Sequence, residues 1–268
     1  MIKVREYRVV ESVEEAWELN QKRPNRVVAG NMWLRLGKGQ AGTLIDISRL
    51  GLDTIEETDE EFVIGAMVPL RELETNTALN AFADGAFREA VRHIIGVQFR
   101  NLATVGGSIF GRFGFSDVLT IFLAMDTTVE LYKGGMVPLE EFAKMKRDRD
   151  ILLRLHVRKE KARYVYNSVR TNATTDFPVL TGAMAFLPDH SYRLVIGARP
   201  ARAVRLAAAD QFKGFVNSED TARKMAEAAR DEVVTSGNLR GSAEYRKHLT
   251  GVVVKRMMKS LREGGNQE

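Results

Sequence analysis

Cysteine is absent from this chain of 268 residues. The chain therefore has no disulfide of its own and no cysteine ligand for an iron–sulfur cluster or zinc. Its four histidines are far apart in the sequence, and we predict no metal site. No apolar run approaches the roughly 18 residues that cross a bilayer, and the first residues enter a strand-like pattern rather than a signal sequence. We expect a cytoplasmic protein without a membrane span.

The common nucleotide-binding patterns are missing as well. No Gly-x-Gly-x-x-Gly follows the first predicted strand, and no Gly-Lys-Ser/Thr occurs, so a bound dinucleotide would need another architecture. The net charge is +5 and the sequence pI is near 9.4. Because the charges are interspersed, they indicate a mildly basic surface, with an anionic ligand or an acidic partner as alternatives. No basic helix or aromatic-rich motif indicates nucleic acid.

The composition is that of a globular protein: 44% of residues are hydrophobic and 28% are charged, which supports a substantial core in one or two domains. Short strands are predicted at residues 7–10, 26–29, 43–47, 61–66 and 128–132. Ser12 and Glu15 form a capping box that opens a helix through about Lys22. Further helices are predicted at 70–82, 87–97 and 117–125, the last with Asp117 as its N-cap.

The pattern changes after residue 160. Three strands are predicted at 163–169, 178–187 and 192–198, followed by two serine-capped helices at 218–233 and 242–262. Strands followed by helices indicate a small domain of their own, and the whole chain belongs to the α+β class. We predict a first domain at residues 1–163, with subdomains at about 1–55 and 56–163, and a C-terminal domain with a three-stranded sheet at 164–268.

Two glycine-containing segments are candidates for ligand binding. Residues 104–114 hold four glycines beside Thr104 and Ser108. Glycines allow successive N–H groups to turn toward one anion such as a pyrophosphate, although a tight structural turn between two helices would use the same residues. Residues 29–34 follow a predicted strand and contain Gly30 and Asn31, a pair that is typical both of turns and of ligand loops.

The run Gln98-Phe99-Arg100-Asn101-Leu102-Ala103-Thr104-Val105-Gly106-Gly107-Ser108 resembles the FAD signature of the molybdopterin dehydrogenase flavoproteins. This family includes the FAD domain of xanthine dehydrogenase and the medium subunit of carbon monoxide dehydrogenase. The resemblance extends over the whole chain, from residues 28–31 to the C-terminal run 239–249. It implies a two-subdomain FAD-binding fold of the vanillyl-alcohol oxidase (PCMH) type, followed by the small C-terminal domain.

The resemblance also implies which residues contact FAD. Residues 29–34 and 104–108 would clasp its pyrophosphate, and Asp117 would bind its ribityl or ribose hydroxyls. Ile94 and Leu152 match apolar positions that line the flavin or adenine pocket, with ordinary core as the alternative. Asn167 stands where the xanthine dehydrogenase branch has a lysine that reaches the flavin ring, which leaves the flavin potential open. The expected cofactor-binding residues of the two segments are Ala29, Gly30, Asn31, Met32, Trp33, Leu34, Thr104, Val105, Gly106, Gly107 and Ser108. Arg100 and Asn101 of the same motif are also expected to bind the cofactor.

The function implied is electron transfer in an assembly of three kinds of subunit. A large subunit with molybdopterin would oxidise the substrate, a small subunit with two [2Fe–2S] clusters would pass electrons on, and FAD on this chain would deliver them to NAD⁺, with quinone or oxygen as other acceptors. No catalytic side chain is nominated, because flavin electron transfer needs none. A stand-alone oxidoreductase of the vanillyl-alcohol oxidase type and a flavin-free assembly module are the alternatives.

Overall fold

The computed structural model describes residues 2–172 and 176–264, which fold into two compact units. Each unit is built from three segments of the chain. Unit 1 comprises Met1–Glu72, Val97–Gly111 and Thr127–Arg158, and unit 2 comprises Leu73–Gly96, Arg112–Asp126 and Lys159–Glu268. The predicted domains at 1–163 and 164–268 are continuous along the chain, whereas each compact unit combines three separate segments. The domain boundary near residue 163 therefore stays a prediction.

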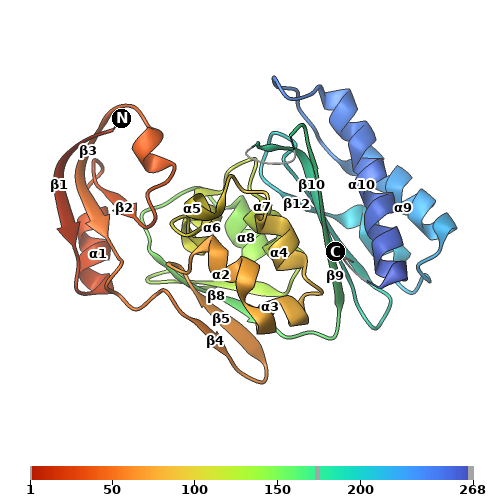
Figure 1. Ribbon diagram of the computed structural model, residues 1–268, viewed down its shortest axis with the longest axis horizontal. Coiled ribbons are helices and arrows are strands. Elements are labelled where there is room, and N and C mark those ends of the chain that lie inside the picture. The colour runs from red at the N-terminus through yellow and green to blue at the C-terminus, as the bar shows by residue number, and fades with distance from the viewer. Residues whose placement is uncertain (1, 173–175, 265–268) are drawn as a thin grey trace. The chain divides into compact units, whose positions relative to one another are not determined.

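Unit 1 begins with a parallel three-stranded sheet in the order β1-β3-β2 (Figure 1). Its strands are β1 (Lys3–Val9), β2 (Arg26–Val28) and β3 (Gln40–Asp46). The connection from β1 to β2 contains α1 (Val13–Asn20), whose N-cap Ser12 accepts a hydrogen bond from the Glu15 N–H. The predicted capping box thus opens this helix, although the Glu15 carboxylate binds the Glu11 N–H and Arg8 instead of the Ser12 N–H.

A second sheet of unit 1 is antiparallel and has the order β4-β5-β8-β6-β7. Its strands are β4 (Ile55–Glu57), β5 (Glu61–Gly65), β6 (Thr127–Leu131), β7 (Gly135–Pro138) and β8 (Leu152–Arg158). Leu155 and Val157 of the central strand β8 are fully buried, whereas Arg154 and His156, which alternate with them, are partly exposed. This alternation is expected where one face of a sheet is covered and the other meets solvent. Unit 1 also contains the short helices α5 (Val97–Arg100), α6 (Val105–Gly111) and α8 (Leu139–Lys144) and the 3-10 helix η1 (Leu34–Leu36).

Unit 2 is organised around an antiparallel sheet in the order β12-β11-β10-β9. The strands are β9 (Arg163–Arg170), β10 (Pro178–Phe186), β11 (Tyr192–Gly197) and β12 (Val204–Leu206). Figure 1 shows the helices α9 (Glu219–Glu232) and α10 (Ala243–Glu263) on one side of this sheet. The shorter helices α4 (Ala86–Val91) and α7 (Asp117–Leu123) lie on the other side.

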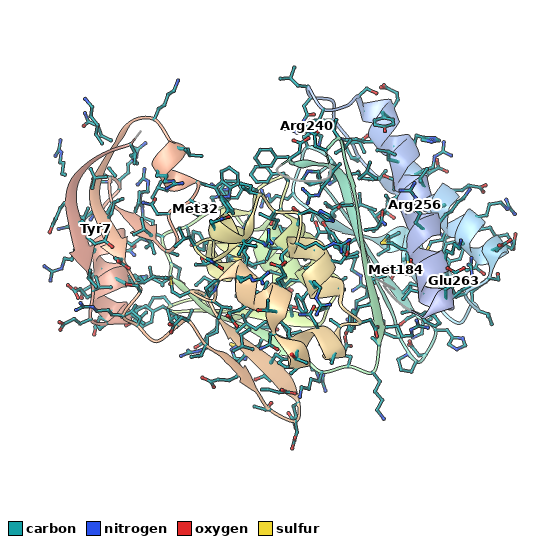
Figure 2. The ribbon with its side chains drawn as sticks, viewed as in Figure 1. Tyr7, Met32, Met184, Arg240, Arg256 and Glu263 are labelled. Atoms are coloured by element: carbon teal, nitrogen blue, oxygen red, sulfur yellow. The ribbon has the colours of Figure 1, made fainter. Side chains whose placement is uncertain are left out.

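Strand β10 is buried on both faces because helices cover both sides of the sheet. Leu180 and Met184 pack into the core formed with α9 and α10, where Figure 2 shows Met184. A Cβ on Gly182 would lie 2.5 Å from Val253 of α10, so this position has room only for glycine. On the opposite face, the Thr181 hydroxyl lies 3.0 Å from the Thr120 hydroxyl of α7.

The predicted C-terminal elements are confirmed. All three strands are present, the turn at 188–191 joins β10 to β11, and Ser218 and Ser242 cap α9 and α10. The short strand β12 adds a fourth strand that was not expected, since three residues are too few to carry a periodic pattern.

Several predictions for the first half were wrong. The helix expected at 70–82 is two helices, α2 (Leu70–Thr75) and α3 (Thr77–Phe82), because Asn76 caps a new helix by accepting from the Leu79 N–H. The helix expected at 87–97 ends at Val91. Asp117 is the first residue of α7 rather than its N-cap; Ser116 has that role and accepts from the Leu119 N–H.

Candidate functional site

In unit 1, residues 29–34 directly contact residues 98–104, which belong to the run 98–108 that resembles the FAD signature. An ideal Cβ on Gly30 would lie 1.5 Å from the carbonyl oxygen of Leu102 and 2.4 Å from its carbonyl carbon. The Trp33 ring packs edge-on against Phe99, with 5.5 Å between ring centroids. Residues 29–34 and 98–104 therefore form one clasp, and the backbone contact explains why residue 30 is glycine.

The glycine-rich stretch is a helix rather than the nest or the tight turn expected from its composition. Residues Val105–Gly111 form α6. The N–H groups of Val105 and Gly106 donate to the carbonyls of Val68 and Ala66, each over 2.9 Å. Those two N–H groups are therefore engaged within the protein, and the close approach to Ala66 is what requires a glycine at position 106.

Two hydroxyl groups mark the start of α6. The Thr104 Oγ1 accepts from the Gly107 N–H over 3.2 Å, and the Ser108 hydroxyl donates to the Thr104 carbonyl over 2.9 Å. Gly107 is exposed, and the nearest atom to its ideal Cβ is the Thr104 Oγ1 at 3.1 Å. The start of α6 therefore reaches the surface at Gly107, with Ser108 partly buried and Thr104 buried beside it.

Asn31 combines a left-handed backbone conformation with a buried side-chain oxygen that has no hydrogen-bond partner. Its φ is 54°, in the left-handed region that asparagine tolerates better than most residues. Its buried Oδ1 has no hydrogen-bond partner in the structure. A buried amide oxygen without a partner is costly, so Asn31 offers a polar group to a ligand at the clasp. Of its neighbours, Met32 is buried and Leu34 packs on the small core of Val28, Ala41 and Leu44.

The remaining expected residues of unit 1 differ in their exposure. Ala29 lies just after β2 and is partly buried. Arg100 is buried at the end of α5, and Asn101, which follows it, is exposed. Leu152 is buried at the start of β8, beside Leu131 of β6. Arg100 and Leu152 therefore belong to the interior of unit 1, whereas Asn101 reaches its surface.

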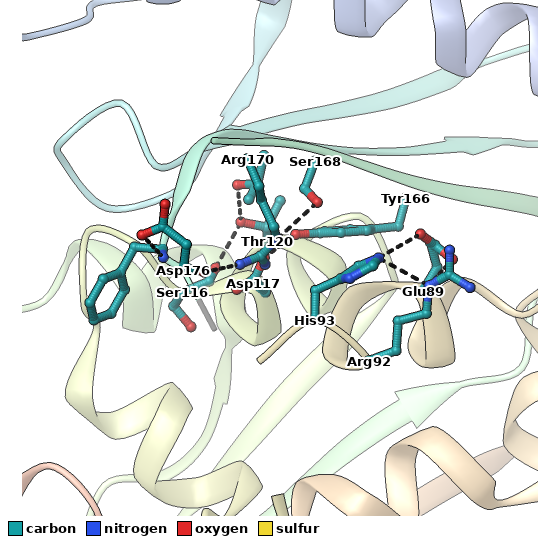
Figure 3. Close-up of polar contacts among 12 residues, drawn as sticks. Glu89, Arg92, His93, Ser116, Asp117, Thr120, Tyr166, Ser168, Arg170 and Asp176 are labelled. Atoms are coloured by element: carbon teal, nitrogen blue, oxygen red, sulfur yellow. Dashed lines mark hydrogen bonds and ion pairs between the residues drawn. The ribbon is translucent and has the colours of Figure 1, made fainter. Parts of the chain in front are cut away.

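In unit 2, Asp117 lies in a buried polar network (Figure 3). Its Oδ1 accepts from the Tyr166 hydroxyl over 2.5 Å and pairs with Nη2 of Arg170 over 2.5 Å. Burial raises the pKa of the Asp117 carboxyl, and the charge of Arg170 and the Tyr166 hydroxyl act against that increase. Burial also raises the pKa of the Tyr166 phenol well above its usual range, so Tyr166 is a hydrogen-bond donor.

Asn167 and Asp117 lie on opposite faces of the sheet of unit 2. Val165 and Val169 of β9 belong to the core formed with α9 and α10, and the register of β9 with β10 is regular from Arg163 to Val169. Because side chains alternate along a strand, Asn167 shares the face of Val165 and Tyr166 faces the other way. The buried Asn167 Oδ1 has no hydrogen-bond partner in the structure. Ile94 lies in the turn after α4 and is partly buried.

The sequence analysis did not single out Tyr166 or Arg170, although β9 carried a signal. Residues 164, 166, 168 and 170 are aromatic or polar, and they alternate with the apolar Val165 and Val169. Tyr166 and Arg170 are four positions apart and so share one face of the strand, opposite the face of Val165 and Val169. This pattern could have indicated a polar site on that face.

Over residues 2–172 and 176–264, no group of three or more His, Asp or Glu side chains is arranged to hold a metal ion. In the same described ranges, no helix has both the length and the apolar character needed to cross a membrane.

Two family matches together cover most of the chain. Residues 3–157 match the family described as the FAD binding domain in molybdopterin dehydrogenase. Residues 166–261 match the family described as the CO dehydrogenase flavoprotein C-terminal domain. The first match alone spans more than half of the sequence.

Individual proteins resemble the chain over different lengths. YgfM of Escherichia coli (strain K12) is 26% identical over 261 residues, which is 96% of either chain. The 6-hydroxypseudooxynicotine dehydrogenase complex subunit alpha of Paenarthrobacter nicotinovorans is 28% identical over 146 residues, which is 51% of this chain and 49% of that protein. A chain in the carbon monoxide dehydrogenase structure from Hydrogenophaga pseudoflava has a TM-score of 0.86 at 24% identity, covering 96% of this chain and 97% of that one. At that identity, the structural likeness shows a shared fold.

Proposed function

Because the chain belongs to the family of FAD-binding domains of molybdopterin dehydrogenases, we propose that it passes electrons from the [2Fe–2S] clusters of a partner subunit to NAD⁺. Membership of this family makes it an FAD-binding oxidoreductase subunit and confirms the resemblance seen in the sequence. The match to a carbon monoxide dehydrogenase chain confirms the predicted fold class. Bound FAD supplies the redox chemistry, so the protein's own task is to bind and orient it.

The observation that carries the proposal is the clasp of unit 1. Gly30 packs on the Leu102 carbonyl, and Asn31 beside it has a buried amide oxygen without a partner. A half-turn of the Asn31 side-chain amide exchanges its oxygen and its nitrogen, so Asn31 can donate a hydrogen bond to an anionic ligand. Thr104 and Ser108 add two hydroxyl groups. We propose that these groups hold the FAD pyrophosphate, which accepts hydrogen bonds and donates none.

The other proposed contacts follow from the resemblance. Asp117 would accept from sugar hydroxyls of FAD, and Ile94 and Leu152 would provide apolar surface. Asn167 is the weakest member of the set, because Val165 and Val169 on its face pack against α9 and α10. The division into domains at 1–163 and 164–268 is also proposed, supported by family matches that end at residue 157 and begin again at residue 166.

The partners are proposed from composition and from relatives. This sequence has no cysteine to ligate an iron–sulfur cluster, and we propose that the clusters that deliver electrons to FAD lie on a partner subunit. The Paenarthrobacter relative is named as a subunit of a dehydrogenase complex. These points support an assembly with an iron–sulfur subunit and a molybdopterin subunit, and the resemblance to xanthine dehydrogenase supports NAD⁺ as the acceptor.

The first test is the absorbance spectrum of the purified full-length chain. We expect flavin bands near about 370 and 450 nm and FAD, rather than FMN, on release. Gly107→Asp should abolish FAD binding because its carboxylate would oppose the pyrophosphate, whereas Gly107→Asn, which has the same size and no charge, should retain much of it. A folded protein that stays colourless with excess FAD would contradict the proposal.

The acceptor requires a separate measurement. The bound flavin would be reduced under anaerobic conditions, NAD⁺ added, and reoxidation of the flavin followed together with the formation of NADH. Stoichiometric NADH supports the proposed acceptor. Reoxidation by a quinone or by oxygen, with none by NAD⁺, would replace NAD⁺ and leave the FAD assignment intact.

A further inference from the structure

The carboxylate of Asp117 is not needed to complete α7. Ser116 already caps the helix, because its hydroxyl accepts from the Leu119 N–H over 3.0 Å. Asp117 and Arg170 nevertheless form an ion pair in which each side chain is only 6% exposed. A buried ion pair is often no better for stability than a well-packed apolar pair, because both charges lose their hydration. The pair therefore calls for an explanation beyond local structure.

Both partners of Asp117 bind the same oxygen and come from the same strand. The Tyr166 hydroxyl and the Arg170 guanidinium each reach Oδ1 (Figure 3). Tyr166 and Arg170 are four residues apart on β9 and so project from one face of the sheet. Two donors on one oxygen fix the rotation of the carboxylate, because turning it would break both hydrogen bonds at once.

Arg170 is itself held in place. Its Nη1 donates to the Asp176 carbonyl over 2.5 Å, and its Nε donates to the Ser168 hydroxyl over 3.3 Å. The Asp176 carboxylate is in turn bound by Arg240, whose Nη2 is 3.0 Å away. Because a guanidinium group is planar and rigid, these bonds set its plane relative to Asp117.

We propose that Tyr166 and Arg170 are positioning residues that keep the Asp117 carboxylate in a fixed orientation to accept hydrogen bonds from the sugar hydroxyls of FAD. The inference rests on the proposed function, in which Asp117 contacts those hydroxyls. It assigns roles to two residues of β9 that would act on FAD affinity through Asp117 and not by touching the cofactor.

The charge of Asp117 depends on the same neighbours. Burial raises the pKa of the carboxyl, while Arg170 and the Tyr166 hydroxyl oppose that effect. Glu89 of α4 also acts on Tyr166 and likewise favours the protonated phenol. Removal of the Arg170 charge therefore raises the pKa of Asp117 further, and a protonated Asp117 is a poorer acceptor for a hydroxyl group.

A double-mutant cycle on the full-length chain tests the proposal, with FAD titrated into apoprotein and binding followed by quenching of flavin fluorescence. Tyr166→Phe keeps the buried ring and should weaken FAD binding about tenfold, the effect of one hydrogen bond to a charged group. In the Asp117→Asn background, the same substitution should change the dissociation constant by less than about twofold, because positioning acts through Asp117. Tyr192→Phe, which removes another buried hydroxyl of unit 2, bonded to the Phe215 carbonyl, is the control and should leave the affinity unchanged.

Arg170→Gln supplies an independent readout. Its FAD affinity should fall more steeply than that of the wild type as the pH decreases from about 8 to 5, because loss of the Arg170 charge raises the pKa of Asp117 further. If Arg170→Gln does not fold, the Tyr166 cycle decides. Equal effects of Tyr166→Phe in both backgrounds, or no effect in either, would overturn the positioning roles while FAD binding by the wild type stands. A wild-type chain that binds no FAD would instead contradict the proposed function.

Discussion

Replacing Gly30 by alanine tests the clasp of unit 1 most directly. Real Cβ atoms essentially never approach a heavy atom within 3.0 Å, yet a Cβ at this position would lie 1.5 Å from the Leu102 oxygen. The segments 29–34 and 98–104 would have to separate by about 1.5 Å. Overpacking of this kind costs roughly 1–3 kcal/mol. Because most of residues 35–40 are exposed, the first segment can move outward, and we expect a cost within that range rather than failure to fold.

FAD binding should respond more strongly than stability does. A loss of about 2 kcal/mol would lower the melting temperature by roughly 4–8 °C in a protein of this size. Opening the clasp would also move Asn31 away from Thr104 and Ser108, and we expect FAD affinity to fall at least about thirtyfold, which corresponds to roughly 2 kcal/mol of lost binding energy.

The assays are differential scanning fluorimetry of the apoprotein and titration with FAD. Gly237→Ala is the matched control, since the nearest atoms to its Cβ lie at 3.7 Å and its φ is not positive. That variant should keep both its melting temperature and its FAD affinity. A Gly30→Ala protein indistinguishable from the wild type in both assays would refute the contact between the two segments.

Three further predictions concern unit 2. Arg246→Met should destabilise the protein by roughly 3–4 kcal/mol, because the fully buried guanidinium donates to three backbone carbonyls and a side-chain oxygen. Chemical denaturation measures this loss of unfolding free energy, and a change below about 1 kcal/mol would contradict the prediction. Ser116→Ala should cost about 1 kcal/mol through loss of the α7 cap, with Ser116→Asp as the control that keeps an acceptor, both measured by thermal unfolding. Ser191 and Lys213 hold the pKa of Asp189 at about 2, below its ordinary 3.8. The associated stabilisation is therefore present above pH 3.8 and is lost as the pH falls toward 2, and an NMR titration midpoint at 3.8 for this carboxyl would contradict it.

Caps and alternation made much of the fold predictable. Ser12, Ser218 and Ser242 each marked the start of a helix that the structure contains, because a hydroxyl acceptor satisfies N–H groups that the helix leaves open. The strands of the C-terminal half also followed their apolar pattern. By contrast, β4 and β7 are short and partly exposed, and they gave little pattern to recognise. Strand β8, at the centre of its sheet, was missed although its buried face alternates.

The candidate site was only partly predictable. The motif located the two segments of unit 1. The glycine content of residues 104–114 predicted a loop, whereas Val105–Gly111 form α6. A pair of glycines lowers helix propensity but does not exclude a helix that tertiary contacts stabilise. Gly30 looked like a ligand-binding glycine, and the structure gives it a packing role against Leu102. The partners of Asp117 lie 49 and 53 residues further along the chain, a separation that no local pattern can report.

The division of the chain between the two units has a consequence for its synthesis on the ribosome. The chain passes from one unit to the other five times. The central strand β8 ends at Arg158, so the five-stranded sheet cannot close until that residue has emerged, and by then two segments of unit 2 are already present without their own sheet. Neither unit can therefore be folded and released as a finished N-terminal block, in contrast to the usual domain-by-domain order. A nascent chain halted shortly after residue 158 should expose the apolar faces of α4 and α7. We therefore expect chaperones to bind most strongly during this stage of synthesis, before the sheet of unit 2 has emerged.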